Sequence, residues 1–389
     1  MTVSLLAVAA FFSAAALRIC DAMLPRLASD FSVTPGTAGQ IIIWFTVAYG
    51  LVQLLFGPMG DRYGKARLVR LALAGCAVAS LASALAPDFE VLVWTRVAWG
   101  IAAAGVIPLA MAWIGDTVPY DQRQATLAHL LTGTISGMMA GQLAGGLFAE
   151  SAAGWRAAFF SLSVGYFVVA VLLTVRARRA HALIAAPAGA ASQVPMAQQL
   201  LAVLRSPWAR VVLLAVLAEG FFLLGPLSYL PTYLHVHHKL PLSTASALAA
   251  LNAVGGLAYA FTASHIVARF GERRMVLAGG WLMGGGFLAW WISVLPLLAG
   301  AIALVVGFGT FLYHNTLQTH ATQMAPAARG TSVAVFASFL FTGQALGVTA
   351  AGYILDRFGF TPVLLSAAVA LPVVGWGFAR ALRRRSADD

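Results

Sequence analysis

The chain has 389 residues, of which 60% are hydrophobic and only 10% are charged, and its formal net charge is +11. Soluble domains are typically about 45–50% apolar and about 25% charged. The composition therefore excludes an ordinary soluble protein and predicts that most of the chain lies in a lipid bilayer. The two cysteines, Cys20 and Cys76, both fall in apolar runs, so they exclude the disulfide framework of a small secreted protein.

Long apolar runs follow one another along the whole chain. A transmembrane helix needs about 20 mostly apolar residues. The first run lacks a basic flank, so we interpret it as a membrane helix rather than a cleaved signal peptide. The twelve expected spans are 4–26, 37–57, 67–87, 91–114, 126–149, 156–175, 209–233, 243–266, 275–294, 297–320, 331–354 and 361–381.

One connection is much longer than the others. Residues 176–208 begin with a cluster of arginines and continue as "AAPAGAASQVP". Such a stretch of alanine, proline, glycine and serine is typical of a linker. We expect an N-terminal six-helix bundle over 1–175, a cytoplasmic linker loop over 176–208 and a C-terminal six-helix bundle over 209–389.

The basic residues are distributed unevenly between the two predicted faces of the membrane. Of the 24 lysines and arginines, 18 fall on one side, 4 on the other and 2 within spans. The positive-inside rule then places both termini and the linker in the cytoplasm. The basic excess is explained by topology, so we expect no nucleic-acid partner. The predicted location is a bacterial-type inner (plasma) membrane, which the chain crosses many times.

The chain contains an internal repeat. Two helices that are six crossings apart run in the same direction through the membrane. Residues that match at such an offset therefore predict two parallel repeats, related by an axis along the membrane normal. Transporters often use this plan and bind their substrate between the repeats. At an offset of 206 or 207 residues, the matches include Leu24–Pro25 with Leu230–Pro231, Gly137 with Gly343, Gly141 with Gly347, and Gly64 with Gly271.

The turn "GPMGDRYGKARL" lies between the second and third spans. The positive-inside rule accounts for Lys65 and Arg67, but not for Asp61, because acidic residues contribute little to that rule. The turn resembles the G-x-x-x-D-R-x-G-[RK]-x-[RK] motif of the major facilitator superfamily. The residues that match are Gly57, Asp61, Arg62, Gly64, Lys65 and Arg67.

This resemblance covers nearly the whole chain, because the twelve spans and the central loop fit the family too. It implies an all-α membrane protein with twelve transmembrane helices in two parallel six-helix repeats. It also implies that Asp61 meets the start of the 331–354 span when the cytoplasmic side is closed. Arg62 or Arg67 would then reach Asp116, and the turn would latch the halves together.

The fifth span is rich in glycine. It is similar to the G-x-x-x-G-P-x-x-G-G motif of proton-antiporting drug exporters, with Gln142 where that motif has proline. Small residues at this spacing let helices approach closely. We expect either contacts at which helices of the other half move, or ordinary packing without motion. The glycines concerned are Gly137, Gly141, Gly145 and Gly146, with Gly343 and Gly347 in the eleventh span.

Charged residues within the lipid are costly and therefore suggest function. Arg18 and Asp21 lie one turn apart in the first span, and Asp21 can pair with Arg18, with Arg96, or with each in turn. Arg96 is either a structural bridge or part of the site. Glu219 has no charged neighbour within a helical turn. Asp21 and Glu219 are each either a structural group or a carrier of protons or substrate.

The tenth span adds the polar residues Tyr313, His314 and Asn315. The family resemblance implies that spans 1, 4, 7 and 10 line the central cavity, so we place these three residues there. His314 is either a proton relay or a packed, hydrogen-bonded residue.

The leading hypothesis is a monomeric secondary transporter that exports small, partly apolar compounds in exchange for protons by alternating access. The alternative is proton-coupled uptake of a small anionic metabolite, bound by Arg18 and Arg96. A membrane sensor that does not transport is less favoured. The sequence contains no catalytic constellation, so we expect no enzyme and no cofactor. "HVHH" at 235–238 has no nearby cysteine or acid, so we expect no metal site.

Overall fold

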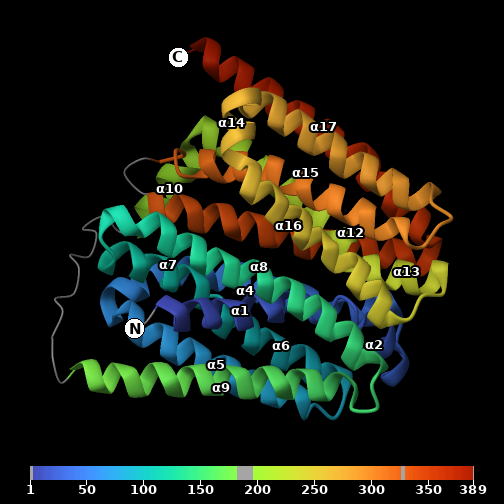
Figure 1. The fold of residues 1–389 in the computed structure, drawn as a ribbon, viewed down its shortest axis with the longest axis horizontal. Coiled ribbons are helices and arrows are strands. Elements are labelled where there is room, and N and C mark those ends of the chain that lie inside the picture. Colours follow the sequence, from blue (N-terminus) through green and yellow to red (C-terminus); the bar gives the residue numbers. More distant parts are fainter. Residues whose placement is uncertain (1–2, 182–195, 326–328, 389) are drawn as a thin grey trace.

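In the computed structural model, residues 3–181, 196–325 and 329–388 are described, and nearly all of them are helical (Figure 1). Strands are absent from these ranges. An all-helical chain is what a bilayer demands, because a helix satisfies its own backbone hydrogen bonds where no water is present.

The helices before the central linker pack side by side in the lower part of Figure 1. They are α1 (Val3–Arg18), α2 (Leu24–Asp30), α3 (Pro35–Ala38), α4 (Gln40–Tyr63), α5 (Lys65–Ala84), α6 (Phe89–Ala103), α7 (Val106–Thr117), α8 (Tyr120–Glu150) and α9 (Gly154–His181).

The helices after the linker fill the upper part of the same view. They are α10 (Met196–Arg205), α11 (Pro207–Glu219), the π-helix η1 (Gly220–Leu224), α12 (Gly225–Ser228), α13 (Leu230–His238), α14 (Leu242–Ile292), α15 (Leu298–Ala321), α16 (Arg329–Phe358) and α17 (Phe360–Asp388).

These helices are consistent with twelve membrane crossings. Within the described ranges, ten helical segments are long and apolar enough to cross a bilayer. The helix α1 has 16 residues and continues through a turn into α2, while α8 has 31 residues whose hydropathy is lowered by glycine and threonine. With α1 and α8, the crossings follow the twelve spans predicted from the sequence.

Two glycines with left-handed backbone angles mark equivalent turns in the two halves. Gly64 has φ +88° and separates α4 from α5. Gly271 has φ +68° and interrupts α14, which is therefore two crossings joined without a loop. Glycine adopts such angles without the steric cost of a Cβ. The sequence repeat at 207 residues thus corresponds to a repeated backbone shape.

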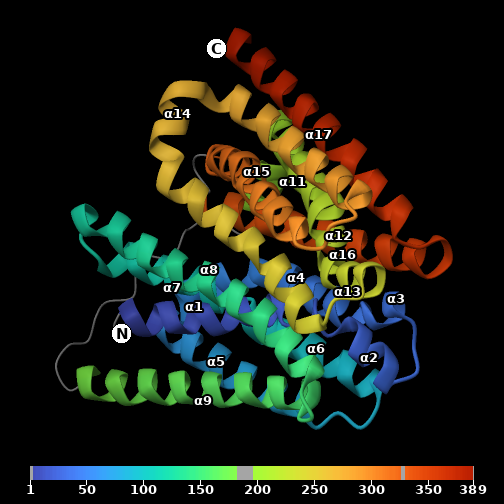
Figure 2. The same ribbon diagram turned by 45° about the vertical axis from the view of Figure 1, so that its right-hand side comes forward.

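Most buried hydrophobic residues fall into two clusters. One draws mainly on residues 6–170 and the other on residues 203–382. The rotated view separates the corresponding groups of helices (Figure 2). This packing is consistent with bundles at 1–175 and 209–389, and that division stays a prediction.

The predicted linker 176–208 contains more helix than expected. The helix α9 continues to His181, and α10 occupies 196–205, while 182–195 lie outside the described residues. Leu200 and Val203 attach α10 to the second core cluster, whereas Gln198 and Arg205 are exposed. Because α10 is much shorter than a membrane span of about 20 residues, the criterion of a long apolar run does not predict it.

The repeat extends to helix pairing. In the first half α1 packs on α8, α4 on α6 and α5 on α9, and in the second α11 packs on α16, while α14 packs on α15 and α17. Two close contacts show the equivalence at single residues. Gly137 faces the Phe11 carbonyl as Gly343 faces that of Leu217, 206 residues on (343 − 137 = 217 − 11).

The glycines of the fifth and eleventh spans pack within their own halves. A Cβ at Gly137 or Gly141 would overlap the backbone of α1, one at Gly145 that of Ile19 just after α1, and one at Gly343 or Gly347 the backbone of α11 and η1. The alternative in which these five face the other half is therefore wrong, and they take part in packing within each half. The spacing of glycines along one helix shows that one of its faces lacks side chains. It cannot identify which other helix packs against that face.

Gly146 is different, because it faces the other half. A Cβ there would overlap the Ser246 side chain and the Leu242 carbonyl of α14. Of the predicted packing glycines, this one lies at the interface between the halves.

We expect Gly137→Ala to lower the apparent Tm of the purified protein in detergent. The added methyl overlaps the Phe11 carbonyl, and overpacking of this kind costs about 1–3 kcal/mol. The matched control is Gly285→Ala in α14, where a Cβ meets nothing within 4 Å. The control should keep or raise the Tm, since alanine favours helix. Equal Tm values for both variants would contradict this account of the α1–α8 contact.

Candidate functional site

A cavity of about 190 Å³ lies between the two halves. Its wall is formed by α1 and α8 from the first half, and by α11–α16 from the second half. Most lining side chains are leucine, methionine, phenylalanine or alanine. The polar and charged ones are Arg18, Gln142, Glu219, Asn252, Thr310, His314 and Gln344.

Glu219 and His314 form a pair at this cavity. The Nδ1 atom of His314 lies 3.0 and 3.1 Å from the two carboxylate oxygens of Glu219. Glu219 is the last residue of α11 and is 1% exposed, and the π-helix η1 follows it directly. Single π-helical turns often occur at functional sites. The pair thus places a carboxylate and an imidazole within hydrogen-bond distance of each other, and both residues line the cavity.

The sequence identified both residues but not their pairing. Glu219 has no charged neighbour on its own helix, whereas His314 reaches it from α15, 95 residues away. The absence of a partner within one turn was therefore a poor guide to the actual environment of the carboxylate.

Arg18 and Asp21 form a second pair, at the end of α1. The Nη1 atom of Arg18 lies 3.0 Å from Oδ2 of Asp21. Asp21 is fully buried in the turn before α2, while Arg18 lines the cavity. The Oδ1 atom of Asp21 has no hydrogen-bond donor among the described residues. The Arg18 side chain therefore lines the cavity, and the Asp21 carboxylate lies behind it.

Arg96 lies inside the first bundle, away from the cavity wall. Its Nε donates to the Ile41 carbonyl at 3.2 Å and its Nη2 to the Ala16 carbonyl at 3.3 Å. The guanidinium carbon lies 4.0 Å from the centre of the Phe45 ring. Arg96 thus ties α6 to α4 and α1, which is the structural-bridge alternative. Between Arg96 and Asp21, the described atoms form no ion pair.

Of the three consecutive polar residues of α15, only His314 lines the cavity. Tyr313 is 1% exposed and its ring packs against Phe378 of α17. Asn315 donates from Nδ2 to the Tyr259 hydroxyl at 3.0 Å. Successive helical residues point about 100° apart, so a run of three cannot share one face. The expectation that Tyr313 and Asn315 line the cavity is wrong.

Sequence reasoning missed the uncharged polar residues of the wall. These are Gln142, Asn252, Thr310 and Gln344. An amide within a span costs less than a charge, so its signal is weaker. Gln142 did carry a signal, because it stands where the exporter motif has proline.

The 57–68 turn is organised around Lys65. Its Nζ atom lies 3.0 Å from Oδ1 of Asp61 and 2.5 Å from Oδ2 of Asp116. In this conformation Lys65 therefore binds Asp116, and the pairing of Asp116 with Arg62 or Arg67 that is expected with the cytoplasmic side closed is not formed. Arg62 instead lies over the ring of Tyr63, at 5.3 Å.

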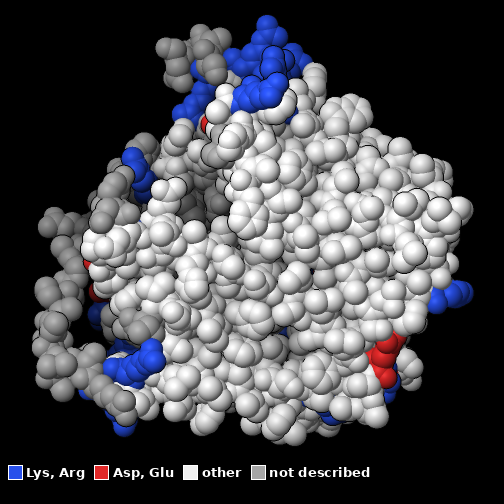
Figure 3. Space-filling view, viewed as in Figure 1, with Lys and Arg blue, Asp and Glu red and all other residues white. Residues whose placement is uncertain are grey.

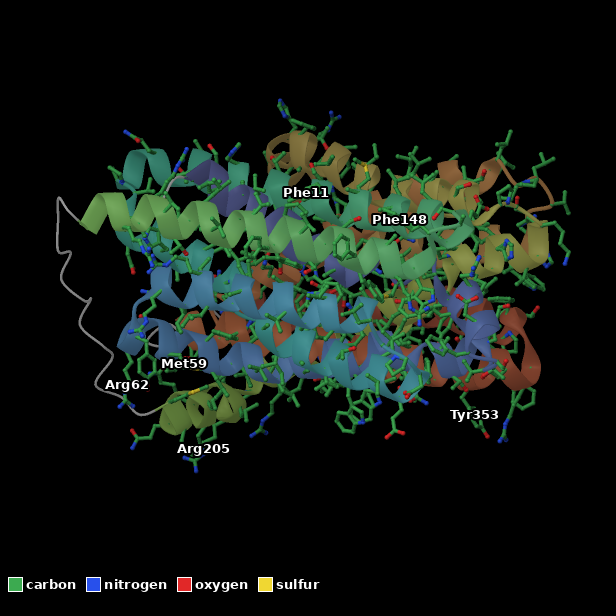
Figure 4. The ribbon with its side chains drawn as sticks, turned by 90° about the horizontal axis from the view of Figure 1, so that it is seen from below. Phe11, Met59, Arg62, Phe148, Arg205 and Tyr353 are labelled. Carbon is green, nitrogen blue, oxygen red and sulfur yellow. The ribbon has the colours of Figure 1, made fainter. Side chains whose placement is uncertain are left out.

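The turn and the α10 helix lie at the same end of the molecule. Figure 4 shows Arg62 and Arg205 at one end and Tyr353 at the other. We call these the basic end and the opposite end. Lys and Arg side chains cluster at the left and top margins of the space-filling view, whereas its middle is almost free of charge (Figure 3).

At the basic end, the start of α16 meets α10. The Thr331 hydroxyl donates to Oε1 of Gln199 at 2.6 Å. Asp61 makes no hydrogen bond to this helix start in the described part of the chain. The latch contact inferred from the family resemblance is therefore not formed in this conformation.

At the opposite end, the two halves are joined by hydrogen bonds to Asp356 of α16. Its carboxylate accepts from the Thr34 hydroxyl at 2.5 Å and from the Gly36 backbone N–H at 3.0 Å. Gly36 also lies so close to Gly352 that no side chain would fit between them. We call this contact the Thr34–Asp356 clasp.

Known proteins resemble the chain over nearly its full length. An uncharacterized MFS-type transporter of Bacillus subtilis, YceJ, is 25% identical over 88% of both chains. A chloramphenicol resistance protein of Streptomyces lividans is 29% identical over 84% of this chain and 81% of its own.

Solved structures share the fold. The nucleoside transporter NupG aligns with a TM-score of 0.79 at 12% identity, covering 97% of this chain and 99% of its own. A bacterial homolog of the lysosomal transporter Spinster gives 0.76 at 18% identity, covering 98% and 95%. The sequence profile of the Major Facilitator Superfamily matches residues 6–339 and 239–389. The chain therefore belongs to the Major Facilitator Superfamily of membrane transporters.

Proposed function

We propose that this transporter exports small, partly apolar compounds in exchange for protons. The observation that carries the proposal is the Glu219–His314 pair, which faces a largely apolar cavity between the two halves. A buried carboxylate that reaches a cavity can be ionised in one state and neutral in another. Residues of this kind within a membrane mark ion and proton pathways.

The geometry favours Glu219 over Asp21 as the proton carrier. Glu219 lines the cavity, and its only described partner is a histidine that can itself take up a proton. Asp21 is held behind Arg18 by the ion pair between them, and it does not line the cavity. In the proposed cycle, a proton from outside neutralises Glu219 and substrate leaves. Release of the proton to the cytoplasm then resets the site for the next substrate.

The proposed substrate class follows from the cavity wall. An apolar wall with a few amides and hydroxyls suits small molecules that are themselves mostly apolar. Two relatives are named for resistance to antibiotics: the chloramphenicol resistance protein, and the puromycin resistance protein pur8 of Streptomyces alboniger, which is 31% identical over 34% of this chain. We therefore choose chloramphenicol as the first test substrate.

The alternative is proton-coupled uptake of a small anion. One observation favours it, since Arg18 presents a guanidinium to the cavity. The two functions differ in direction. Export requires substrate and protons to cross in opposite directions, whereas uptake requires them to cross together.

We expect Glu219→Gln to abolish acceleration of chloramphenicol flux by a pH gradient in proteoliposomes. The amide cannot release a proton, so gradient-driven flux should fall by roughly tenfold or more, equivalent to about 1.4 kcal/mol. Exchange of substrate at equal pH should persist, because the cavity and its shape remain.

A matched control exists outside the cavity. Glu272 forms the same kind of pair with His320, at 3.0 Å, near the basic end. Glu272→Gln should keep gradient-driven flux close to that of the wild type. Normal coupling in Glu219→Gln, or flux in the same direction as the protons, would refute proton-coupled export.

We also propose that the 57–68 turn stabilises the conformation in which the basic end is closed. In the present conformation Asp61 binds Lys65 and the Thr34–Asp356 clasp joins the halves at the opposite end. With the topology expected from the positive-inside rule, the cavity faces the cytoplasm here. Closure would bring Asp61 to the start of α16, where free N–H groups and the helix dipole favour an anion.

Asp61→Asn should therefore increase labelling of a cavity cysteine from the basic side. Cys20 and Cys76 are buried, so Asn252→Cys gives a single reactive site for an impermeant maleimide. The expected increase in rate is roughly 2- to 5-fold, corresponding to the ~0.5–1 kcal/mol contributed by a charge at a helix N-terminus.

Asp116→Asn is the control for this experiment. It removes the other carboxylate bound to Lys65 but no contact with α16. It should leave labelling near the wild-type rate. If labelling of the Asp61→Asn protein equals that of the wild type, the turn is not a latch.

A further inference from the structure

A second hollow lies on the side of the first bundle, well away from the central cavity. It is a groove of about 930 Å³ between α5 and α9. These two helices lie side by side at the lower edge of Figures 1 and 2. Its lining includes Arg67, Arg70 and Arg178, and apolar residues such as Val78 and Val171. We call it the α5–α9 groove.

The groove has a charged entrance and an apolar remainder. The three arginines lie at the basic end, where α5 begins and α9 approaches its end. Beyond them the wall is apolar except for Thr174. From Arg67 to Val78 is 11 residues, or about 16 Å of helix. The hydrocarbon of one leaflet is about 15 Å thick, so the groove matches one leaflet in length.

Among the described residues, none forms an ion pair with the arginines at the entrance. In the described part of the chain, Arg67, Arg70 and Arg178 form no ion pair, and the groove is lined by no acidic residue. Lys65, only two residues before Arg67, is bound by two carboxylates. The carboxylates of Asp61 and Asp116 therefore bind Lys65, and the neighbouring arginines remain available to bind an anion from outside the protein.

The internal repeat provides a comparison within the same molecule. The equivalent groove lies between the second part of α14 and α17, and it measures about 280 Å³. Gly154 and Gly359, both with positive φ, set the offset between α9 and α17 at 205 (359 − 154). Val171 then corresponds to Trp376, and both line their grooves.

The second groove is also lined by three arginines, but they are placed differently. At the offset of 207 that relates Gly64 to Gly271, Arg70 corresponds to Leu277. A larger side chain at the position of Val171 thus accompanies the smaller hollow, and an arginine is replaced by leucine at the position of Arg70. The first groove differs from the second mainly in its space and in where its arginines lie.

We propose that the α5–α9 groove binds one anionic phospholipid of the leaflet at the basic end. Arg67, Arg70 and Arg178 would hold the phosphate, and an acyl chain would lie along the apolar wall. Clusters of basic residues between transmembrane helices bind anionic lipid headgroups in this manner, and each cation near the surface adds favourable energy. This lipid site does not depend on the proposed substrate or on proton coupling.

Thermal shift and native mass spectrometry test the proposal on the delipidated, purified protein. Phosphatidylglycerol should raise the apparent Tm and remain bound as a single adduct. Phosphatidylcholine with the same acyl chains should bind at least about tenfold more weakly. The triple variant Arg67→Gln, Arg70→Gln, Arg178→Gln should lose this preference. Its control carries Arg273→Gln, Arg380→Gln and Arg383→Gln in the second groove and should keep it.

A second variant fills the groove without changing the charge. Val171→Trp introduces the residue type found at the equivalent position of the second half, and it should abolish the adduct. Leu172→Trp is the control, because Leu172 is 44% exposed but does not line the groove.

Three results would overturn the proposal. The first is equal binding of the two phospholipids by the wild type. The second is an unchanged preference in the triple variant or in Val171→Trp. The third is an equal Tm increase with glycerol phosphate alone, which would show binding of an anion without an acyl chain.

Discussion

Close backbone contact between glycine-rich and cavity-lining helices is the constraint on which the rest of the structure depends. Lipid provides no hydrophobic force between helices, so close packing must supply the attraction. Gly137 and Gly141 let α8 touch the backbone of α1, and the equivalent glycines of α16 hold α11. Those two held helices carry Arg18 and Glu219. The position of each charge at the cavity is therefore set by a contact that tolerates no side chain.

The two halves share a scaffold but not a chemistry. With the offset of 206, Arg18 corresponds to Leu224 (18 + 206), and both line the cavity. Glu219 corresponds to the buried Ser13 (219 − 206). The first half therefore contributes a cation to the cavity and the second half contributes a carboxylate with its histidine. The charged groups at the cavity wall are therefore asymmetric, although the helices around the cavity are related by approximate symmetry.

The sequence predicted what lipid penalises and missed what depends on packing between distant segments. Twelve spans, the repeat and the intramembrane charges follow from the cost of placing polar groups in hydrocarbon. The hydrogen-bond and ion-pair partners of these side chains, in contrast, do not follow from that cost. The Glu219–His314 contact joins residues 95 apart, and the choice of Lys65 over Arg62 for Asp116 depends on side-chain direction after Gly64. The direction of Tyr313 and Asn315 likewise depends on which face of α15 is covered.

The helix α16 links the two ends of the molecule mechanically. It has 30 residues and so extends about 45 Å, with Thr331 near its start and Asp356 near its end. Here its end is held by the Thr34–Asp356 clasp while its start contacts α10. If α16 moves as a rigid rod, a tilt that brings its start toward Asp61 would draw its end away from Thr34. On the proposed mechanism, the clasp and the latch would then form in different conformations, as alternating access requires of two gates on one helix.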